Sequence, residues 1–477
     1  MLVAAVPAAG IVLGWVLAWL PRARWVAMVA LVAATTYVAD VNLDFHGDYR
    51  GMSRSFDVSS MDVLVVGLVV FLWLDALRRH QRPVGAPRGP LLVWWPAGWG
   101  GLVAFVAWCA LTIPMSRVPL YGLMDLLKLV RGLAIYWVAA NLVSRDGVAG
   151  RIPWLLLPYL VVECAVVALQ YLQGYWWIPG TFTHKNSFAM ATNMLLPPVL
   201  IAGLTRRHWS WPLLVLLWGA GAIAVVLSRS RMGWLTLAVA SGATIVVALA
   251  LAIAWRDGRL LLRQSITLVV VVLLGAAALA QMADGLMARL VEDREVSLDF
   301  RHRNNTIALA LASRHLFGVG LNNYVVELWR PIGALLPPYD RTVAHHLYLY
   351  VAAETGWIGL IVFLVALAGV WATGLTAIVF GRRRAARSVV AGLLLGLLTA
   401  HLHSFLESDL LRRETYFIFC MLAGTVAGVH HAEGLGGLRR TAHRVVRLLR
   451  GPPERPAHPV ARAAPQRAGG PRRAGLC

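Results

Sequence analysis

Long runs of apolar residues follow one another along almost the whole chain, and short polar turns separate them. A helix of about 20 apolar residues crosses a hydrocarbon core of about 30 Å, and most of these runs approach that length. The pattern predicts an all-α fold, a polytopic transmembrane helix bundle of 12 or 13 helices. The runs fall at roughly 2–20, 25–39, 61–77, 91–113, 121–142, 152–172, 187–204, 212–227, 232–254, 261–282, 346–380, 388–406 and 414–430.

One polar stretch, residues 283–343, is much longer than the other turns. Within it, a short helix starting near Asp299 is predicted to close in a tight turn at Gly318, because glycine tolerates the backbone conformations that such turns need. We expect residues 1–432 to form one bundle that includes this loop. Residues 433–477 are rich in Arg, Pro and Ala, which is typical of a basic, largely disordered tail.

The distribution of basic residues predicts the orientation of the bundle. One set of alternate short turns carries 17 Arg and Lys residues, whereas the opposite set carries 8. Cytoplasmic loops of membrane proteins are the more basic ones, so the first set and the Arg-rich tail should lie in the cytoplasm. Loop 283–343 is then extracytoplasmic. The N-terminus would be outside with 13 helices and inside with 12.

Composition narrows the class of protein. With 59% hydrophobic and 14% charged residues, the chain is not an ordinary soluble protein. Its net charge of +21 is spread over turns and tail, which favours membrane lipid over nucleic acid as the partner. No cysteine pair has metal-ligand spacing, so neither a metal site, another cofactor nor a disulfide framework is expected. The cysteines are Cys109, Cys164, Cys420 and Cys477.

Four arginines in predicted extracytoplasmic segments are candidate anion-binding residues. Arg229 and Arg231 lie in a short turn, and Arg301 and Arg303 lie in the long loop. A guanidinium group is always charged, and its planar fork matches two phosphate oxygens at once. The structural alternative is snorkelling of the turn arginines to lipid headgroups and ordinary solvation of the loop arginines.

His345 and His346 begin the eleventh apolar run and are the candidates for proton transfer. An unperturbed imidazole has a pKa of about 6.5, so its neutral form accepts a proton near neutral pH. A histidine with only a structural role is the alternative. Lys185 and Asn186 end another predicted extracytoplasmic turn and would line the same site.

Charged residues inside the apolar runs are expected to face the bundle interior, because lipid does not solvate them. Asp125 and Lys128 are three residues apart, so they lie on one helix face and should pair. Glu354 is expected to be a structural residue that bonds a neighbouring helix.

These residues resemble the O-antigen ligase and polymerase family of polytopic glycosyltransferases. The ligase motif is His, then Asn, Ser or Gln, nine residues, and Gly-x-x-Gly. His345, Gly356 and Gly359 fit this spacing, although His346 replaces the second residue. Further similarity covers roughly residues 120–430. It lies in Gly180-Thr-Phe-Thr-His-Lys-Asn186, Leu227-Ser-Arg229, and Arg301 followed by Phe317-Gly-Val-Gly320.

The resemblance implies transfer of a glycan from an undecaprenyl-diphosphate-linked donor to an acceptor hydroxyl, on the outer face of the cytoplasmic membrane and without a metal ion. His345 would be the general base, while Arg229 and Arg301 would hold the diphosphate and stabilise charge on the leaving group. The acceptor would be a glycan, a lipid or a protein. The other substrate-binding candidates are Arg231, Arg303, His346, Lys185 and Asn186.

Several functions share these features. A ligase, a polymerase and a protein O-oligosaccharyltransferase all need residues that bind the donor diphosphate and a general base. The sequence does not distinguish these three functions. A transporter of small anions or lipid-linked glycans would also contain many helices and intramembrane charge. Against transport, the candidate residues lie at one membrane face, and no pair of broken helices recurs in two halves of the chain. A non-catalytic assembly subunit would tolerate replacement of His345.

Overall fold

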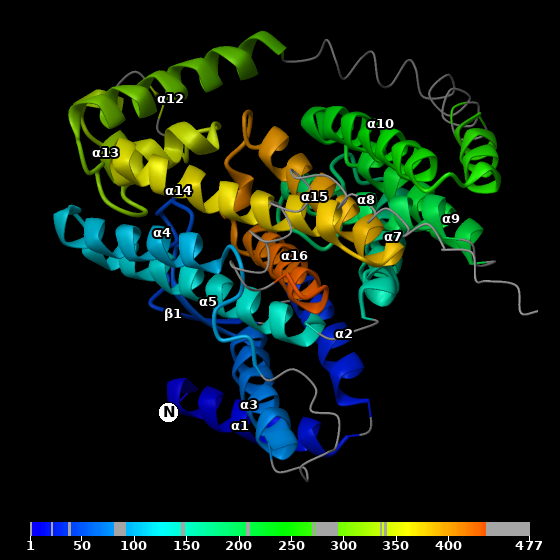
Figure 1. The fold of residues 1–477 in the computed structure, drawn as a ribbon. Coiled ribbons are helices and arrows are strands. Elements are labelled where there is room, and N and C mark those ends of the chain that lie inside the picture. Colours follow the sequence, from blue (N-terminus) through cyan, green and yellow to red (C-terminus); the bar gives the residue numbers. More distant parts are fainter. Residues whose placement is uncertain are drawn as a thin grey trace, which may run out of the picture. The chain divides into compact units, whose positions relative to one another are not determined.

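The computed structural model describes residues 2–435, except for 21, 37–39, 81–91, 145–147, 207–209, 270–271, 273–293, 334–335 and 338–340. The protein is helical almost throughout these residues (Figure 1). Its helices are α1 (Leu2–Trp19), α2 (Ala23–Thr36), α3 (Ser60–His80), α4 (Trp99–Thr112), α5 (Pro119–Val143), α6 (Ile152–Leu155), α7 (Leu157–Leu172), α8 (Lys185–Thr205), α9 (Trp211–Leu227), α10 (Arg231–Ala254), α12 (Arg294–Arg314), α13 (Tyr324–Leu328), α14 (Leu347–Phe380), α15 (Arg384–His403) and α16 (Arg413–Ala432).

The predicted all-α helix bundle is confirmed. Eight helical segments are long and apolar enough to cross a membrane, and four shorter apolar helices accompany them in the described part of the chain. Together they account for every predicted apolar run except 261–282, part of which lies outside the described residues. The division into a bundle and a basic tail stays a prediction, because residues 436–477 also lie outside that part.

One small sheet was not predicted. Strands β1 (Asp40–Leu43) and β2 (Phe56–Ser59) pair antiparallel between α2 and α3, with Asp40 opposite Ser59. The predicted short helix in the long loop is also longer than expected, since α12 begins at Arg294 and not near Asp299.

Helix α8 is the most completely buried of the candidate spans. It packs against α9, α10 and α15, while α5 packs against α16 and α4 against α14 (Figure 1). The predicted pair inside α5 is present, because Lys128 Nζ contacts the Asp125 carboxylate in the protein interior. Lys128 Nζ also donates to the Leu411 carbonyl oxygen at 2.7 Å, which joins α5 to the segment before α16.

A kink divides α14 and fastens it to the long loop. Gly356 has φ 73° and ψ 175° inside this helix, a conformation that is essentially restricted to glycine. Beside the kink, Val319 N–H donates to the Ala353 carbonyl oxygen and Gly320 N–H to the Glu354 carbonyl oxygen, both at 2.9 Å. The Glu354 carboxylate accepts backbone N–H bonds from the same loop, as expected for a structural residue; the donors are Asn322 at 2.9 Å and Tyr324 at 3.2 Å.

Candidate functional site

The carboxylate of Glu407 joins three segments that are far apart in the sequence. Its Oε1 accepts hydrogen bonds from Arg301 Nη2 at 2.6 Å and from Asn186 Nδ2 at 2.9 Å. Its Oε2 lies 2.8 Å from His345 Nδ1. The Glu407 side chain is only 5% exposed, whereas those of His345 and Arg301 are 24% and 27% exposed. A buried carboxylate therefore holds two partly accessible groups, and we call these four residues the Glu407 cluster.

The turn after α15 positions Glu407. Glu407 N–H donates to the His403 carbonyl oxygen at 3.1 Å, which continues the helical bonding for one more turn. Leu347 N–H donates to the Ser404 carbonyl oxygen at 2.9 Å, so the start of α14 is attached to the end of α15. This attachment places His345, just before α14, beside the carboxylate.

The two histidines have different partners. His346 is the N-cap of α14, and its Nδ1 accepts a hydrogen bond from Leu349 N–H at 3.3 Å. Burial lowers the pKa of His346, so it stays neutral near neutral pH. The His345 ring lies edge-on to Phe300, with ring centroids 5.3 Å apart. Because a carboxylate only accepts hydrogen bonds, His345 Nδ1 carries the proton, and Nε2 is left as the proton-accepting atom.

A second buried carboxylate anchors the start of α8 next to the Glu407 cluster. Asp409 Oδ1 accepts from Arg412 Nε at 2.6 Å, and its Oδ2 accepts from Ser187 Oγ at 3.1 Å. Burial raises the pKa of Asp409, but the charge and hydrogen bond of Arg412, together with His184 and His403, outweigh burial and bring this pKa down to about 2. Asp409 is therefore ionised at neutral pH. His184 caps α8 by accepting from Asn186 N–H at 3.2 Å.

Asn186 connects the turn after α9 to the same cluster. Ser230 Oγ donates to Asn186 Oδ1 at 2.8 Å, and Asn186 in turn donates to Glu407. Arg229, one residue before, has a left-handed φ of 54° and an exposed side chain. Its guanidinium lies 4.6 Å from the centre of the Trp176 ring. The serine next to Arg229, and not Arg229 itself, thus contacts the cluster.

The remaining predicted residues have contacts of their own. Arg231 is the first residue of α10 and is half-buried. Lys185 begins α8, and its Nζ lies 6.0 Å from the centre of the Trp177 ring. Arg303 pairs with Asp299 at 2.7 Å on an exposed part of α12, so its charge is already partly balanced. The structure brings His345, Arg301 and Asn186 into direct contact with one carboxylate.

Glu407, Asp409 and Arg412 were not among the site residues predicted from the sequence. All three lie in the polar turn between the last two predicted runs. The signal was present, because acidic residues at the end of an apolar run are costly unless they are paired. Among the residues that the structure describes, no group of three or more His, Cys, Asp and Glu side chains is arranged to hold a metal ion. The expectation of a metal-free site stays a prediction.

The fold and the cluster define a multi-pass helical membrane protein with an arginine, a histidine and a buried carboxylate joined at one end of its bundle. Residues 213–364 match the sequence model of the family described as O-Antigen ligase, which confirms the family resemblance found from the residues. The match contains Arg229, Arg301 and His345, whereas Asn186 and Glu407 lie outside it. No curated protein matches the chain. The family implies membrane glycosyltransferase activity of the ligase or polymerase type.

Proposed function

We propose that the protein transfers a glycan from an undecaprenyl-diphosphate-linked donor to an acceptor hydroxyl at the extracytoplasmic face of the cytoplasmic membrane, without a metal ion. The observation that carries this proposal is the Glu407 cluster, in which one carboxylate holds both His345 and Arg301. A base and a permanent positive charge are thereby kept next to each other, as attack by a hydroxyl on a diphosphate-linked sugar requires.

His345 acts as the general base in this proposal. Its Nε2 takes the proton of the acceptor hydroxyl while the hydroxyl oxygen forms a bond to the anomeric carbon of the donor. The bond between that carbon and the diphosphate oxygen breaks, and undecaprenyl diphosphate leaves with the electron pair. Glu407 is a positioning residue, since it fixes the tautomer and stabilises the imidazolium that forms.

Arg301 binds the diphosphate and stabilises the charge that develops on it. Its Nη2 bond to Glu407 fixes the guanidinium, and the side chain is still 27% exposed. Each charge-assisted hydrogen bond of this kind contributes about 1.5–3 kcal/mol. We assign Arg229, Arg231, Arg303, Lys185 and His346 to the outer diphosphate oxygens and the glycan. Asn186 keeps Glu407 in place and lines the donor site.

The test is transfer from a purified lipid-linked donor by the reconstituted protein, with a metal chelator present. The wild type should transfer glycan, and Arg301→Ala should lower kcat/KM by about 10–100-fold, as the loss of one charge-assisted bond predicts. Arg314→Ala is the matched control, because Arg314 is an exposed residue in the last turn of the same helix. Chelator-sensitive transfer, or equal rates for the two variants, would contradict the proposal.

A further inference from the structure

A cavity of about 350 Å³ lies at the opposite end of the bundle from the Glu407 cluster. Three helices connect the two places. Helix α8 begins at the cluster and ends at the cavity with Thr205, α15 begins at the cavity with Arg384 and ends next to Glu407, and α10 ends at the cavity beside Trp255. The 21 residues of α8 span about 30 Å, which is the thickness of a hydrocarbon core. The cavity therefore belongs to the other membrane surface.

The cavity is positively charged. Its walls contain two guanidinium groups, Arg206 and Arg384, and one carboxylate, Asp257, so one positive charge remains. Arg384 Nη1 lies 3.8 Å from Asp257 Oδ2, which is beyond hydrogen-bond distance. Asp257 Oδ1 accepts the Leu260 N–H at 3.2 Å. The lining thus contains two guanidinium groups and one carboxylate, which leaves an excess of positive charge for a ligand.

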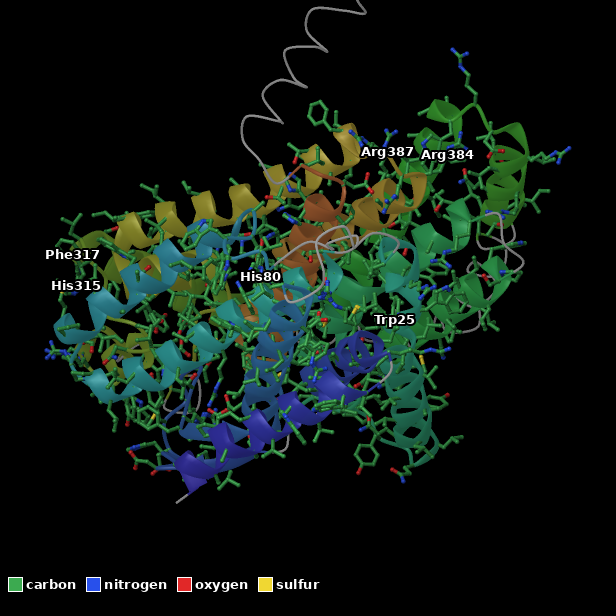
Figure 2. The ribbon with its side chains drawn as sticks, turned by 60° about the horizontal axis from the view of Figure 1, so that its bottom comes forward. Trp25, His80, His315, Phe317, Arg384 and Arg387 are labelled. Atoms are coloured by element: carbon green, nitrogen blue, oxygen red, sulfur yellow. The ribbon has the colours of Figure 1, made fainter. Side chains whose placement is uncertain are left out.

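Indole rings keep the two guanidinium groups in place. The Arg206 guanidinium lies 5.6 Å from the centre of the Trp154 ring, and that of Arg384 lies 5.2 Å from the centre of the Trp255 ring. Arg206 also donates to the Gly150 carbonyl oxygen. Stacked guanidinium groups lose little freedom on binding a planar set of phosphate oxygens. Arg384 and Arg387 lie together near the start of α15, apart from His315 and Phe317, in Figure 2.

The rest of the lining is small and largely apolar. Ala202, Leu260, Ala385 and Val389 line the cavity, and the hydroxyl of Ser388 is bonded to the Arg384 carbonyl oxygen at 2.9 Å. A ligand with one negative charge and a hydrocarbon part fits this combination better than a fully polar anion.

We propose that this cavity binds the phosphate group of a phosphodiester lipid, an anionic phospholipid of the membrane, between Arg206 and Arg384. The headgroup phosphate carries one negative charge, which matches the single positive charge that remains in the lining. Basic pockets between transmembrane helices on the cytoplasmic side bind anionic headgroups in this way. The site differs from the donor site, because the two lie at opposite ends of α8, and it does not depend on the proposed reaction.

Lipid binding to the delipidated, detergent-purified protein tests the proposal. Native mass spectrometry would compare dioleoyl phosphatidylglycerol, dioleoyl phosphatidylcholine and soluble glycerol 1-phosphate. The wild type should retain phosphatidylglycerol in preference to phosphatidylcholine. Ala385→Glu adds a carboxylate at an exposed lining position, so it leaves the helix packing intact and should weaken phosphatidylglycerol binding about tenfold. The double variant Arg206→Gln/Arg384→Gln should weaken it at least as much.

Arg259→Gln is the matched control, because Arg259 is exposed two residues after Asp257 and does not line the cavity. It should bind phosphatidylglycerol like the wild type. Equal retention of the two phospholipids, or equal binding by the wild type and Ala385→Glu, would overturn the proposal. Tighter binding of glycerol 1-phosphate than of phosphatidylglycerol would overturn the lipid assignment and show that the phosphate comes from a soluble ester.

Discussion

Glu407 is a shared hydrogen-bond partner of His345 and Arg301. It thereby sets the tautomer of His345 and the position of Arg301 in the candidate site. A histidine alone at a membrane surface has no defined tautomer, whereas hydrogen bonding of Nδ1 to a carboxylate leaves Nε2 ready to accept a proton. The same carboxylate also holds Arg301. His346 is excluded from this role by its own bond to the N-terminus of α14.

Replacing Glu407 by Gln keeps the size of the side chain and removes its charge. We expect kcat for glycan transfer to fall about 10–100-fold, the usual cost of losing a residue that orients a reacting histidine. Glu414→Gln, which changes a carboxylate paired with Arg413 on α16, should have little effect. The measurement is a double-mutant cycle of transfer rates. Because Glu407 acts partly through His345 and partly through Arg301, Glu407→Gln should cost less in a His345→Ala background than in the wild type, and fully additive losses would contradict its role in positioning His345.

Sequence alone located part of the site. Arg301, His345 and Asn186 could be chosen because their chemistry and their predicted membrane face are local properties. For Glu407 the sequence indicates only that an acidic residue beside an apolar run needs a partner; which partners it has depends on packing of the turn after α15 against α8, α12 and α14. The same limit applies to Arg229, whose contact with Trp176 depends on how two turns approach each other.

At the scale of elements, the kink in α14 links the long loop to the site. Loop residues Val319 and Gly320 bond the carbonyl groups exposed just before Gly356, and the Glu354 carboxylate bonds the next loop residues. The first part of α14, which begins beside His345, is therefore held by both the loop and the end of α15. This double attachment explains how a loop histidine acquires a defined position.

Gly356→Ala should destabilise the protein. A Cβ at this position would clash with the Leu316 carbonyl oxygen, and the backbone conformation itself costs about 1–3 kcal/mol for other residues. Thermal unfolding in detergent should show a lower midpoint for this variant. Gly369→Ala in the same helix is the control, since its Cβ would meet no atom closer than 3.7 Å. An unchanged unfolding midpoint for Gly356→Ala would contradict the claim that the backbone at position 356 requires glycine.

The helices themselves were predictable because lipid imposes a length and an apolar composition on each span. The pairing of β1 with β2 was not, since two four-residue strands in a polar segment carry no periodicity long enough to recognise. The predicted start of α12 was too late in the sequence for a similar reason. The predicted helix begins near Asp299, yet Asp299 lies inside α12 and pairs with Arg303 one turn later.

At the scale of the whole molecule, α8, α10 and α15 separate two charged regions by the thickness of a membrane. One is the Glu407 cluster and the other is the basic cavity. The proposed orientation puts the cluster outside and the cavity in the cytoplasm, in agreement with the excess of basic residues on that side. Glycan transfer then takes place on the face that does not supply nucleotide sugars, which requires a donor that is already lipid-linked.

Cysteine labelling tests this orientation. In a background without the four native cysteines, Ser313→Cys on α12 should react with an impermeant maleimide in sealed right-side-out vesicles. Arg259→Cys should react only after the vesicles are made permeable. Both positions are exposed, so access to the reagent depends on the membrane face alone. The opposite labelling pattern would place the candidate base and the arginines in the cytoplasm and rule out the proposed reaction.

The most direct measurement is the rate of glycan transfer by His345→Ala from a purified undecaprenyl-diphosphate-linked donor. Loss of the general base should lower kcat by about 10²–10⁴-fold, while donor binding, measured separately, is retained. His302→Ala serves as the control, because His302 is an exposed residue of α12 beside Arg301 and should leave the rate unchanged. A folded His345→Ala variant that transfers glycan at the wild-type rate would contradict the account.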